Sequence, residues 1–364
     1  MPVNQNLSNF SDIAFQTAFI IYAVALILSL MYYGRLNGVI NSRREVKAAK
    51  ADSTKATGAY ASGTYAEANS GSESTGTAGT GTAGVLVDDA NGSDDSSTKS
   101  YSQLKEDLAK SESKLDRLGG MTNSLLWVGL VLHLASIVLR GLAVARFPMG
   151  NLYEYMLAIT FGAMLVMMVA MQRKEWRTLW PWILTPLLAL MFYGSTELYA
   201  ESAPVVPALQ SNWLPIHVTI VSLGGSLGIV SGIASVLHLI RRSQPKGKEK
   251  GFMGAIAKPL PAEKKLDQLA YRVAVVTLPV FGLGIVLGAI WAEAAWGRFW
   301  GWDPKETVSF ATWILYAAYL HARATPSWAK FAPWINIVAL VTMIFNLFFI
   351  NMVVSGLHSY AGLN

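Results

Sequence analysis

Four tryptophans fall within twelve residues of this chain, in the segment WAEAAWGRFWGWDPKE at positions 291–306. They are Trp291, Trp296, Trp300 and Trp302, and Gly297 and Gly301 lie among them. Large aromatic rings offer a flat surface for stacking, and glycine lets a ligand approach the backbone closely. A single interfacial tryptophan is usually a membrane anchor, but anchoring does not require this density. The segment therefore predicts a platform for a large planar ligand.

The residues that end this segment have the pattern of a helix start. Asp303 suits the N-cap position, Pro304 the first helical position, and Glu306 the third, where it can complete a capping box. Unpaired backbone N–H groups in the first turn attract anions, and Lys305 and Arg298 add positive charge nearby. Two interpretations stay open: the acidic pair only caps the helix, or this helix start also forms part of an anion site.

Two of the five histidines are expected at the same membrane face as the tryptophans. His217 follows Trp213 and Pro215 at the start of one apolar stretch, and His358 follows the last such stretch. Neutral imidazoles are good axial ligands for haem iron. We therefore predict that both ligate one haem on the tryptophan platform, with the haem propionates directed toward Arg298, Lys305 and the helix start.

The other three histidines have different settings. His321 lies some 18 residues beyond the helix start, about 27 Å along a helix, and an ionisable group inside a span is a functional candidate. His133, in the middle of an earlier span, is a weaker candidate. His238 precedes Arg241 and Arg242 at a predicted membrane boundary, where an interfacial role is expected.

The composition is that of a membrane protein. Of the 364 residues, 52% are hydrophobic and only 14% are charged, which is too apolar for an ordinary soluble chain. We predict an all-α, polytopic bundle, because stretches of roughly 18–25 apolar residues can cross the bilayer as helices. The eight predicted spans are 14–34, 122–143, 153–172, 178–195, 214–240, 271–291, 306–323 and 332–354. No basic segment precedes the first, so we expect a retained span.

The loop charges predict the orientation. Basic residues gather after the first, third and fifth spans, whereas the 196–212 loop holds two glutamates and no Lys or Arg. The positive-inside rule then places both termini and the tryptophan segment on the outer face of the plasma membrane. The net charge of +6 is thus no sign of nucleic-acid binding. The chain has no cysteine, so any thiol chemistry must use the thiols of a partner.

The chain divides into three predicted parts. Residues 1–34 form an N-terminal transmembrane helix, and 122–364 form the membrane domain that carries the site. Residues 35–121 are predicted as a cytoplasmic linker, because 51–100 are low in complexity and rich in Gly, Ser, Thr and Ala. A short charged helix is predicted at 102–118.

The membrane part, from about residue 120 to 364, resembles the CcsA/ResC family of system II cytochrome c biogenesis, whose members are often named CcsB. This family is one of the haem handlers with a tryptophan-rich "WWD" segment. Five motifs carry the resemblance: RFPMGNLYEY at 146–155, NWLPIHV at 212–218, WGRFWGWDPKET at 296–307, YLHAR at 319–323 and GLHSY at 356–360. Phe299 stands where the family commonly has Tyr, and Val308 where it often has Trp.

The resemblance implies a site and an activity. It implies that His217 and His358 ligate the iron of haem b, and that His321 receives haem within the membrane at a second site. It also implies a ResB-type membrane partner and an apocytochrome c substrate whose CxxCH thiols add across the haem vinyl groups. The chain would then be one subunit of a haem lyase, with membrane lipid around it. A haem transporter without attachment activity, or more remotely a glycolipid-binding membrane protein, stays open as an alternative.

Overall fold

The computed structural model describes residues 3–67, 101–205 and 209–358, and the side chains of all of these except 52–67. Over these ranges the chain is helical and contains no strand, which confirms the predicted all-α class. The helices are α1 (Gln5–Glu67), α2 (Tyr101–Val144), α3 (Leu152–Ala170), η1 (Lys174–Leu179), α4 (Trp180–Thr196), α5 (Trp213–Ser243), α6 (Gly251–Ala257), α7 (Glu263–Trp296), α8 (Pro304–Ala324) and α9 (Ala332–Phe345), which a π-helical turn, η3 (Asn346–Ile350), continues.

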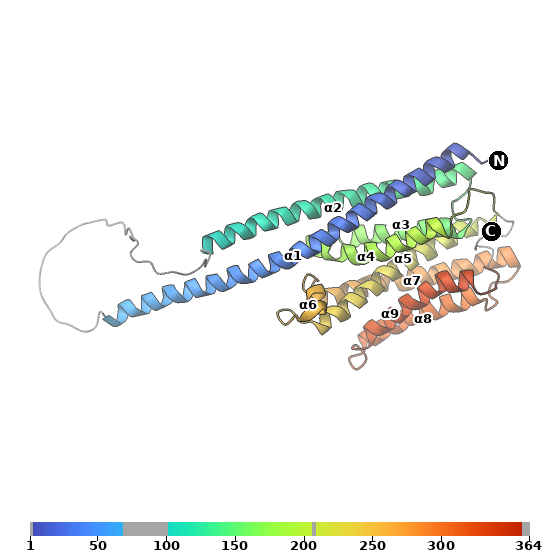
Figure 1. Cartoon of the computed structure of the whole chain (residues 1–364). Coiled ribbons are helices and arrows are strands. Elements are labelled where there is room, and N and C mark those ends of the chain that lie inside the picture. The colour runs from blue at the N-terminus through green and yellow to red at the C-terminus, as the bar shows by residue number, and fades with distance from the viewer. Residues whose placement is uncertain (1–2, 68–100, 206–208, 359–364) are drawn as a thin grey trace, which may run out of the picture. The chain divides into compact units, whose positions relative to one another are not determined.

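Six described helices are long and apolar enough to cross a membrane: α1, α2, α3, α5, α7 and α9 with its π-helical turn. The two other predicted spans, 178–195 and 306–323, also form helices. They are α4, which has only 17 residues, and α8, which carries charged residues in its first and last turns. Both lie alongside the other helices of the bundle (Figure 1).

The described residues belong to two compact units: 3–35, 116–205 and 209–358 to the larger one, and 36–67 with 101–115 to the smaller one. The smaller unit holds the second part of α1 and the first part of α2, where Arg43 and Glu112 form an ion pair of 2.8 Å. Helix α1 thus extends into the region predicted as linker, because residues 44–67 are rich in alanine and contain no proline. The predicted helix at 102–118 is part of α2. Residues 68–100 of the predicted linker lie outside the described residues.

Helix α5 is the centre of the larger unit, where it packs against α3, α7 and α9. Its approach to α7 is close because glycines face the partner helix. A Cβ atom on Gly284 would lie 2.9 Å from the Cα of Val221, and one on Gly224 would lie 2.8 Å from the Cα of Phe281. Small residues allow such close packing between membrane helices. The start of α1 and the ends of α2 and α7 lie at one end of this unit, which we call the tryptophan end (Figure 1).

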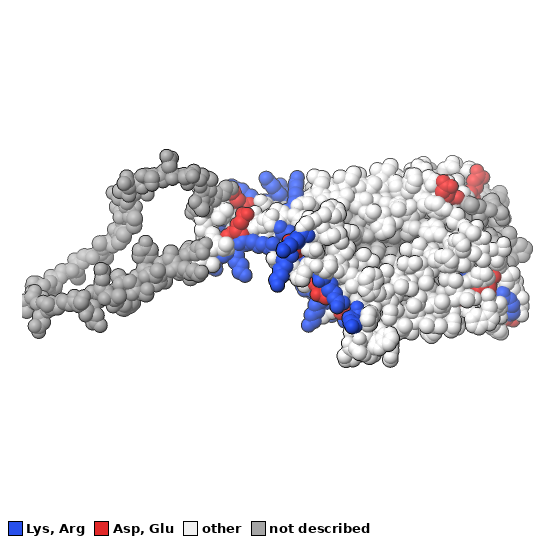
Figure 2. Space-filling model, turned by 60° about the horizontal axis from the view of Figure 1, so that its bottom comes forward, with Lys and Arg blue, Asp and Glu red and all other residues white. Residues whose placement is uncertain are grey.

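The surface matches a protein that lies in a membrane. Figure 2 shows a broad surface without charged residues, with Lys and Arg gathered mainly at one of its ends. Large apolar side chains are exposed on its helices, among them Val24, Val131, Leu283 and Val338. Exposed apolar area of this extent indicates contact with lipid. This confirms a polytopic membrane protein.

A buried ion-pair network holds the loop before α3 at the tryptophan end. Glu154 is fully buried and accepts hydrogen bonds from both terminal nitrogens of Arg146, at 2.8 and 3.1 Å, and from the Gly150 N–H at 2.6 Å. Arg140, also fully buried, lies 3.4 Å from Glu154 and 3.2 Å from Asp12 of α1. The network thus ties α1, α2 and the 146–151 loop to the first turn of α3.

Glu154→Gln is expected to destabilise the fold strongly, because it leaves two buried or half-buried guanidinium groups without their shared carboxylate. Removing one partner of a buried pair costs about 3–5 kcal/mol. The midpoint of thermal unfolding in detergent, followed by tryptophan fluorescence, measures the effect. Glu197→Gln, at an exposed position at the end of α4, is the matched control and should leave the midpoint unchanged. Equal midpoints for the two variants would contradict the assigned role of the network.

Candidate functional site

One elongated cavity of about 410 Å³ reaches the tryptophan end of the larger unit. Its walls come from α3, α4, α5, α7, α8 and α9, and most of its lining is apolar. Along α5 the lining residues run from Leu214 to Ile233, about 28 Å at 1.5 Å per residue. Phe299, in the loop between α7 and α8, lines the cavity at this end and is 60% exposed. A concave, apolar cavity with a few polar groups is the usual form of a small-molecule site.

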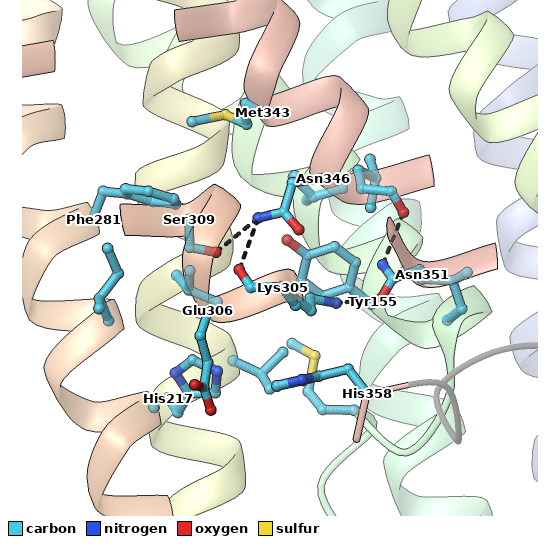
Figure 3. Close-up of a pocket in the computed structure, with 18 of the residues that line it drawn as sticks. Tyr155, His217, Phe281, Lys305, Glu306, Ser309, Met343, Asn346, Asn351 and His358 are labelled. Atoms are coloured by element: carbon cyan, nitrogen blue, oxygen red, sulfur yellow. Dashed lines mark hydrogen bonds between the residues drawn. The ribbon is translucent and has the colours of Figure 1, made fainter. Parts of the chain in front are cut away.

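His217 and His358 both line this cavity, although they lie 141 positions apart in the chain. Figure 3 shows the two imidazoles near one end of the cavity, with Lys305, Tyr155 and Asn346 farther along it. The sequence predicted this pairing from the position of each histidine at the same membrane face. The described residues include no cluster of three His, Asp or Glu side chains that could hold a bare metal ion.

The His217 ring is fixed by α7. Its Nδ1 lies 2.8 Å from the Gly284 carbonyl oxygen, which can only accept, so Nδ1–H donates and Nε2 keeps the lone pair. The ring is parallel to Trp291, with 5.9 Å between the ring centroids. Gly288 leaves room for the imidazole, because a Cβ atom there would lie 2.6 Å from His217 Cε1. The close packing of α5 and α7 therefore sets the orientation of this side chain.

The His358 ring is fixed by Asp303, the N-cap residue of α8. Its Nδ1 donates to Asp303 Oδ2 at 2.8 Å, and the Leu357 N–H donates to the other carboxylate oxygen at 2.8 Å. Burial raises the pKa of Asp303, but the hydrogen bonds from His358 and from the backbone outweigh it and hold the pKa at about 2. Burial lowers the pKa of His358, despite the opposing effect of Asp303. The pair therefore favours an ionised carboxylate and a neutral imidazole with its lone pair on Nε2.

Asp303 also caps α8, and its hydrogen bond with His358 is a role that neither interpretation from the sequence included. The predicted capping box is confirmed: Asp303 accepts from Lys305 N–H, and Glu306 Oε2 accepts from Asp303 N–H at 3.1 Å. Glu306 further accepts from Gly301 N–H and pairs with Arg298 at 3.3 Å. One helix start thus orders both the turn before it and the segment that carries His358.

Three of the four predicted tryptophans line the cavity. Trp291 is buried beside both histidines, and Trp296 lies edge-on to His358, with ring centroids 5.1 Å apart. Trp300 is the third. Trp302 contacts Trp300 but is 65% exposed and does not line the cavity. The rings therefore form the wall of a cavity rather than one flat platform.

The two predicted cations lie in different places. Lys305 lines the cavity and donates to the side-chain carbonyl of Asn351. Arg298 does not line the cavity; it pairs with Glu306 and lies over the Trp296 ring, at 6.0 Å from its centroid.

The structure does not bring the other histidines to this cavity. His321 is exposed near the far end of α8, and a site there stays a prediction. His133 is fully buried among the rings of Phe15, Tyr22 and Phe161. His238 lies 3.3 Å, through Nδ1, from the backbone oxygen of Glu263 in α7, so it has a structural contact.

Several polar residues that line the cavity were not predicted as site residues from the sequence. They are Tyr155, Ser309, Asn346 and Asn351. Asn346 and Asn351 fall within the predicted apolar span 332–354. A polar amide inside a membrane span is a candidate site residue, so both could have been identified from the sequence. In the same way, Arg140 and Glu154 are charged residues within predicted spans, and they indicated the buried ion-pair network.

The sequence profile described as "Cytochrome C assembly protein" matches residues 149–358, which include the cavity and both histidines. The chain belongs to the cytochrome c assembly protein family. The cytochrome c biogenesis protein CcsA of Guillardia theta is 35% identical over 235 residues, 60% of this chain and 78% of that protein. The protein of the same name from Porphyra purpurea is 33% identical over 288 residues, 69% of this chain and 89% of that protein.

A third relative named CcsA, from Synechococcus sp. (strain CC9902), is 30% identical over 272 residues, 67% of this chain and 88% of that protein. This agreement confirms the predicted CcsA/ResC family, and it gives the chain a role in cytochrome c biogenesis. The profile of the cytochrome c assembly family begins at Met149, after the predicted linker and the first two helices.

Proposed function

We propose that this chain binds haem b through His217 and His358 and presents it for covalent attachment to an apocytochrome c. The observation that carries the proposal is the pair of anchored imidazoles in one aromatic cavity. Each Nδ1–H is donated to a fixed acceptor, the Gly284 carbonyl or the Asp303 carboxylate. Metal-bound histidines are held in this way, because the second nitrogen sets the tautomer and the ring orientation.

The rest of the cavity suits a porphyrin substrate. The walls are apolar and include Trp291, Trp296 and Trp300, which can pack against the macrocycle. Haem is the substrate that a cytochrome c assembly protein has to handle. We propose that the cavity faces the outer side of the plasma membrane, with both termini on that side, as the loop charges predict.

The proposed activity is positioning for thioether formation. Each thiol S–H of the CxxCH segment adds across one haem vinyl C=C bond, so that a C–S and a C–H bond form without net oxidation. The chain has no cysteine, and both thiols come from the apocytochrome. A ResB-type membrane protein is the proposed partner. His321, exposed on α8, is the residue proposed to receive haem within the membrane.

Reconstitution tests this proposal. The chain, a ResB-type partner and an apocytochrome c with a CxxCH segment are co-expressed in a bacterium that lacks its own cytochrome c assembly proteins. Covalent haem in the cytochrome, measured by haem staining after denaturing electrophoresis, is expected only when all three are present. Export of haem without any thioether product would contradict attachment and support the transporter alternative, which the length of the cavity along α5 also suits.

Gly288→Ala tests how His217 is positioned. The added methyl group would collide with the imidazole, so we expect haem affinity to fall by about tenfold, the low end of effects seen when ligand support is lost. Absorbance titration of the purified protein with haem measures the affinity. Gly120→Ala in α2, where a Cβ atom meets nothing within 4 Å, is the control. Equal affinities for the two variants would contradict the assigned packing.

A further inference from the structure

A second polar group lies farther along the cavity from the imidazoles (Figure 3). Lys305 donates from Nζ to Asn351 Oδ1, and Asn351 is buried. Nζ also lies 5.9 Å from the centroid of the Tyr155 ring. Beside them, Asn346 donates from Nδ2 to Ser309 Oγ at 2.7 Å. All five side chains line the same cavity.

Lys305 is the one Lys or Arg among the described lining residues, and no carboxylate of the described chain forms an ion pair with it. Glu306, the acidic residue of the lining, is paired with Arg298 instead. An ammonium group in an apolar wall is unfavourable unless an anion or strong acceptors compensate for its lost hydration. The cavity therefore contains a cation whose counter-ion is best supplied by the bound molecule.

Asn346 adds a second donor to this place. Its Oδ1 is buried without a hydrogen-bond partner, while Ser309 can donate its hydroxyl proton. If the amide is turned by half a rotation, Oδ1 accepts from Ser309, Nδ2 gives up its 3.5 Å contact with the Lys305 carbonyl oxygen, and Nδ2 can turn toward a ligand beside Lys305. A carboxylate beside Lys305 would then receive one ammonium and one amide donor.

We infer that Lys305, with Asn346 beside it, is the subsite for a haem propionate, and that it fixes which edge of the haem enters the cavity first. This inference rests on the proposed function. Haem carries its two propionates on one edge and its two vinyl groups toward the opposite edge. With a propionate at Lys305, the vinyl groups point toward the tryptophan end of the cavity, where the exposed Phe299 lies and an apocytochrome thiol can reach them. Arg298, outside the cavity, would favour the reverse orientation.

The test compares haem with its dimethyl ester, which keeps the iron and the vinyl groups but lacks the two carboxylates. Purified full-length chain is titrated with each compound, and the low-spin absorbance gives both affinities. We expect the wild type to bind haem at least about tenfold more tightly than the ester, as for a charge-assisted hydrogen bond. Lys305→Gln should remove this preference, and Arg298→Gln should keep it.

The outcomes separate the two proposals. If the folded wild type binds both compounds equally, or if Arg298→Gln removes the preference while Lys305→Gln keeps it, the subsite is wrong although haem binding stands. If the folded wild type binds neither compound, the proposed function fails as well. The comparison of ligands in the wild type does not depend on the folding of any variant, and thermal midpoints show whether each variant is folded.

Discussion

His217→Ala and His358→Ala are each expected to reduce covalent cytochrome c to background in the reconstituted system. Loss of a residue that only supports a ligand typically lowers metal affinity about 10–100-fold. Loss of a ligand itself should therefore lower the affinity for haem by more than about 100-fold. Both imidazoles are anchored within the cavity, and no other described histidine lines it to replace them. Haem staining of the cytochrome, normalised to the amount of chain in the membrane, measures the effect.

His238→Ala is a closely matched control for His217→Ala. Both histidines lie on α5, and both contact a backbone oxygen of α7 through Nδ1, at 2.8 Å for His217 and 3.3 Å for His238. His238 is outside the cavity, so its loss should leave the cytochrome yield within about twofold of wild type, as expected when an uncharged hydrogen bond away from the site is lost. If the two variants give the same yield, His217 has no special role.

Asp303→Asn is expected to have the second largest effect. Asparagine caps a helix about as well as aspartate, so α8 should still begin at Pro304. The change removes the charge that accepts from His358 Nδ1 and from Leu357 N–H. Losing such a carboxylate–histidine pair lowers metal affinity about 10–100-fold. The measurement is the affinity for haem by absorbance titration, with the cytochrome yield as a second readout.

Glu306→Gln separates this effect from helix capping. Glu306 belongs to the same capping box, and its carboxylate accepts hydrogen bonds from Arg298, from the Gly301 N–H and from the Asp303 N–H. The substituted glutamine side chain should reduce stability slightly, because charge near a helix N-terminus contributes about 0.3–1 kcal/mol. The affinity for haem should stay within about threefold of that of the wild type. Equal losses of haem affinity in Asp303→Asn and Glu306→Gln would mean that Asp303 acts only as a cap.

The sequence predicted the parts of the site that depend on residue type and membrane side. Trp291, His217 and His358 could be placed together because alternating spans bring their segments to one face. The capping box at Asp303 is a local pattern and was predicted in full. The hydrogen bond from His358 to Asp303 joins positions 55 residues apart, and no local pattern indicates it.

Other features depended on packing that the sequence does not display. Trp302 and Trp300 are two residues apart, yet only Trp300 lines the cavity, because the turn before α8 gives Trp302 a positive φ of 56° and directs it outward. Lys305 and Arg298 looked equivalent as cations near a helix start. Glu306 holds Arg298 outside, whereas the first turn of α8 carries Lys305 into the cavity.

The most direct test of the account is the coordination of haem in the purified chain with its partner. Electron paramagnetic resonance of the ferric protein reports the axial ligands. We predict a low-spin, bis-imidazole signal in the wild type, and a high-spin or altered signal in both His217→Ala and His358→Ala. A bis-imidazole signal that stays unchanged in either single variant, or the absence of haem from folded wild type, would contradict ligation by this pair.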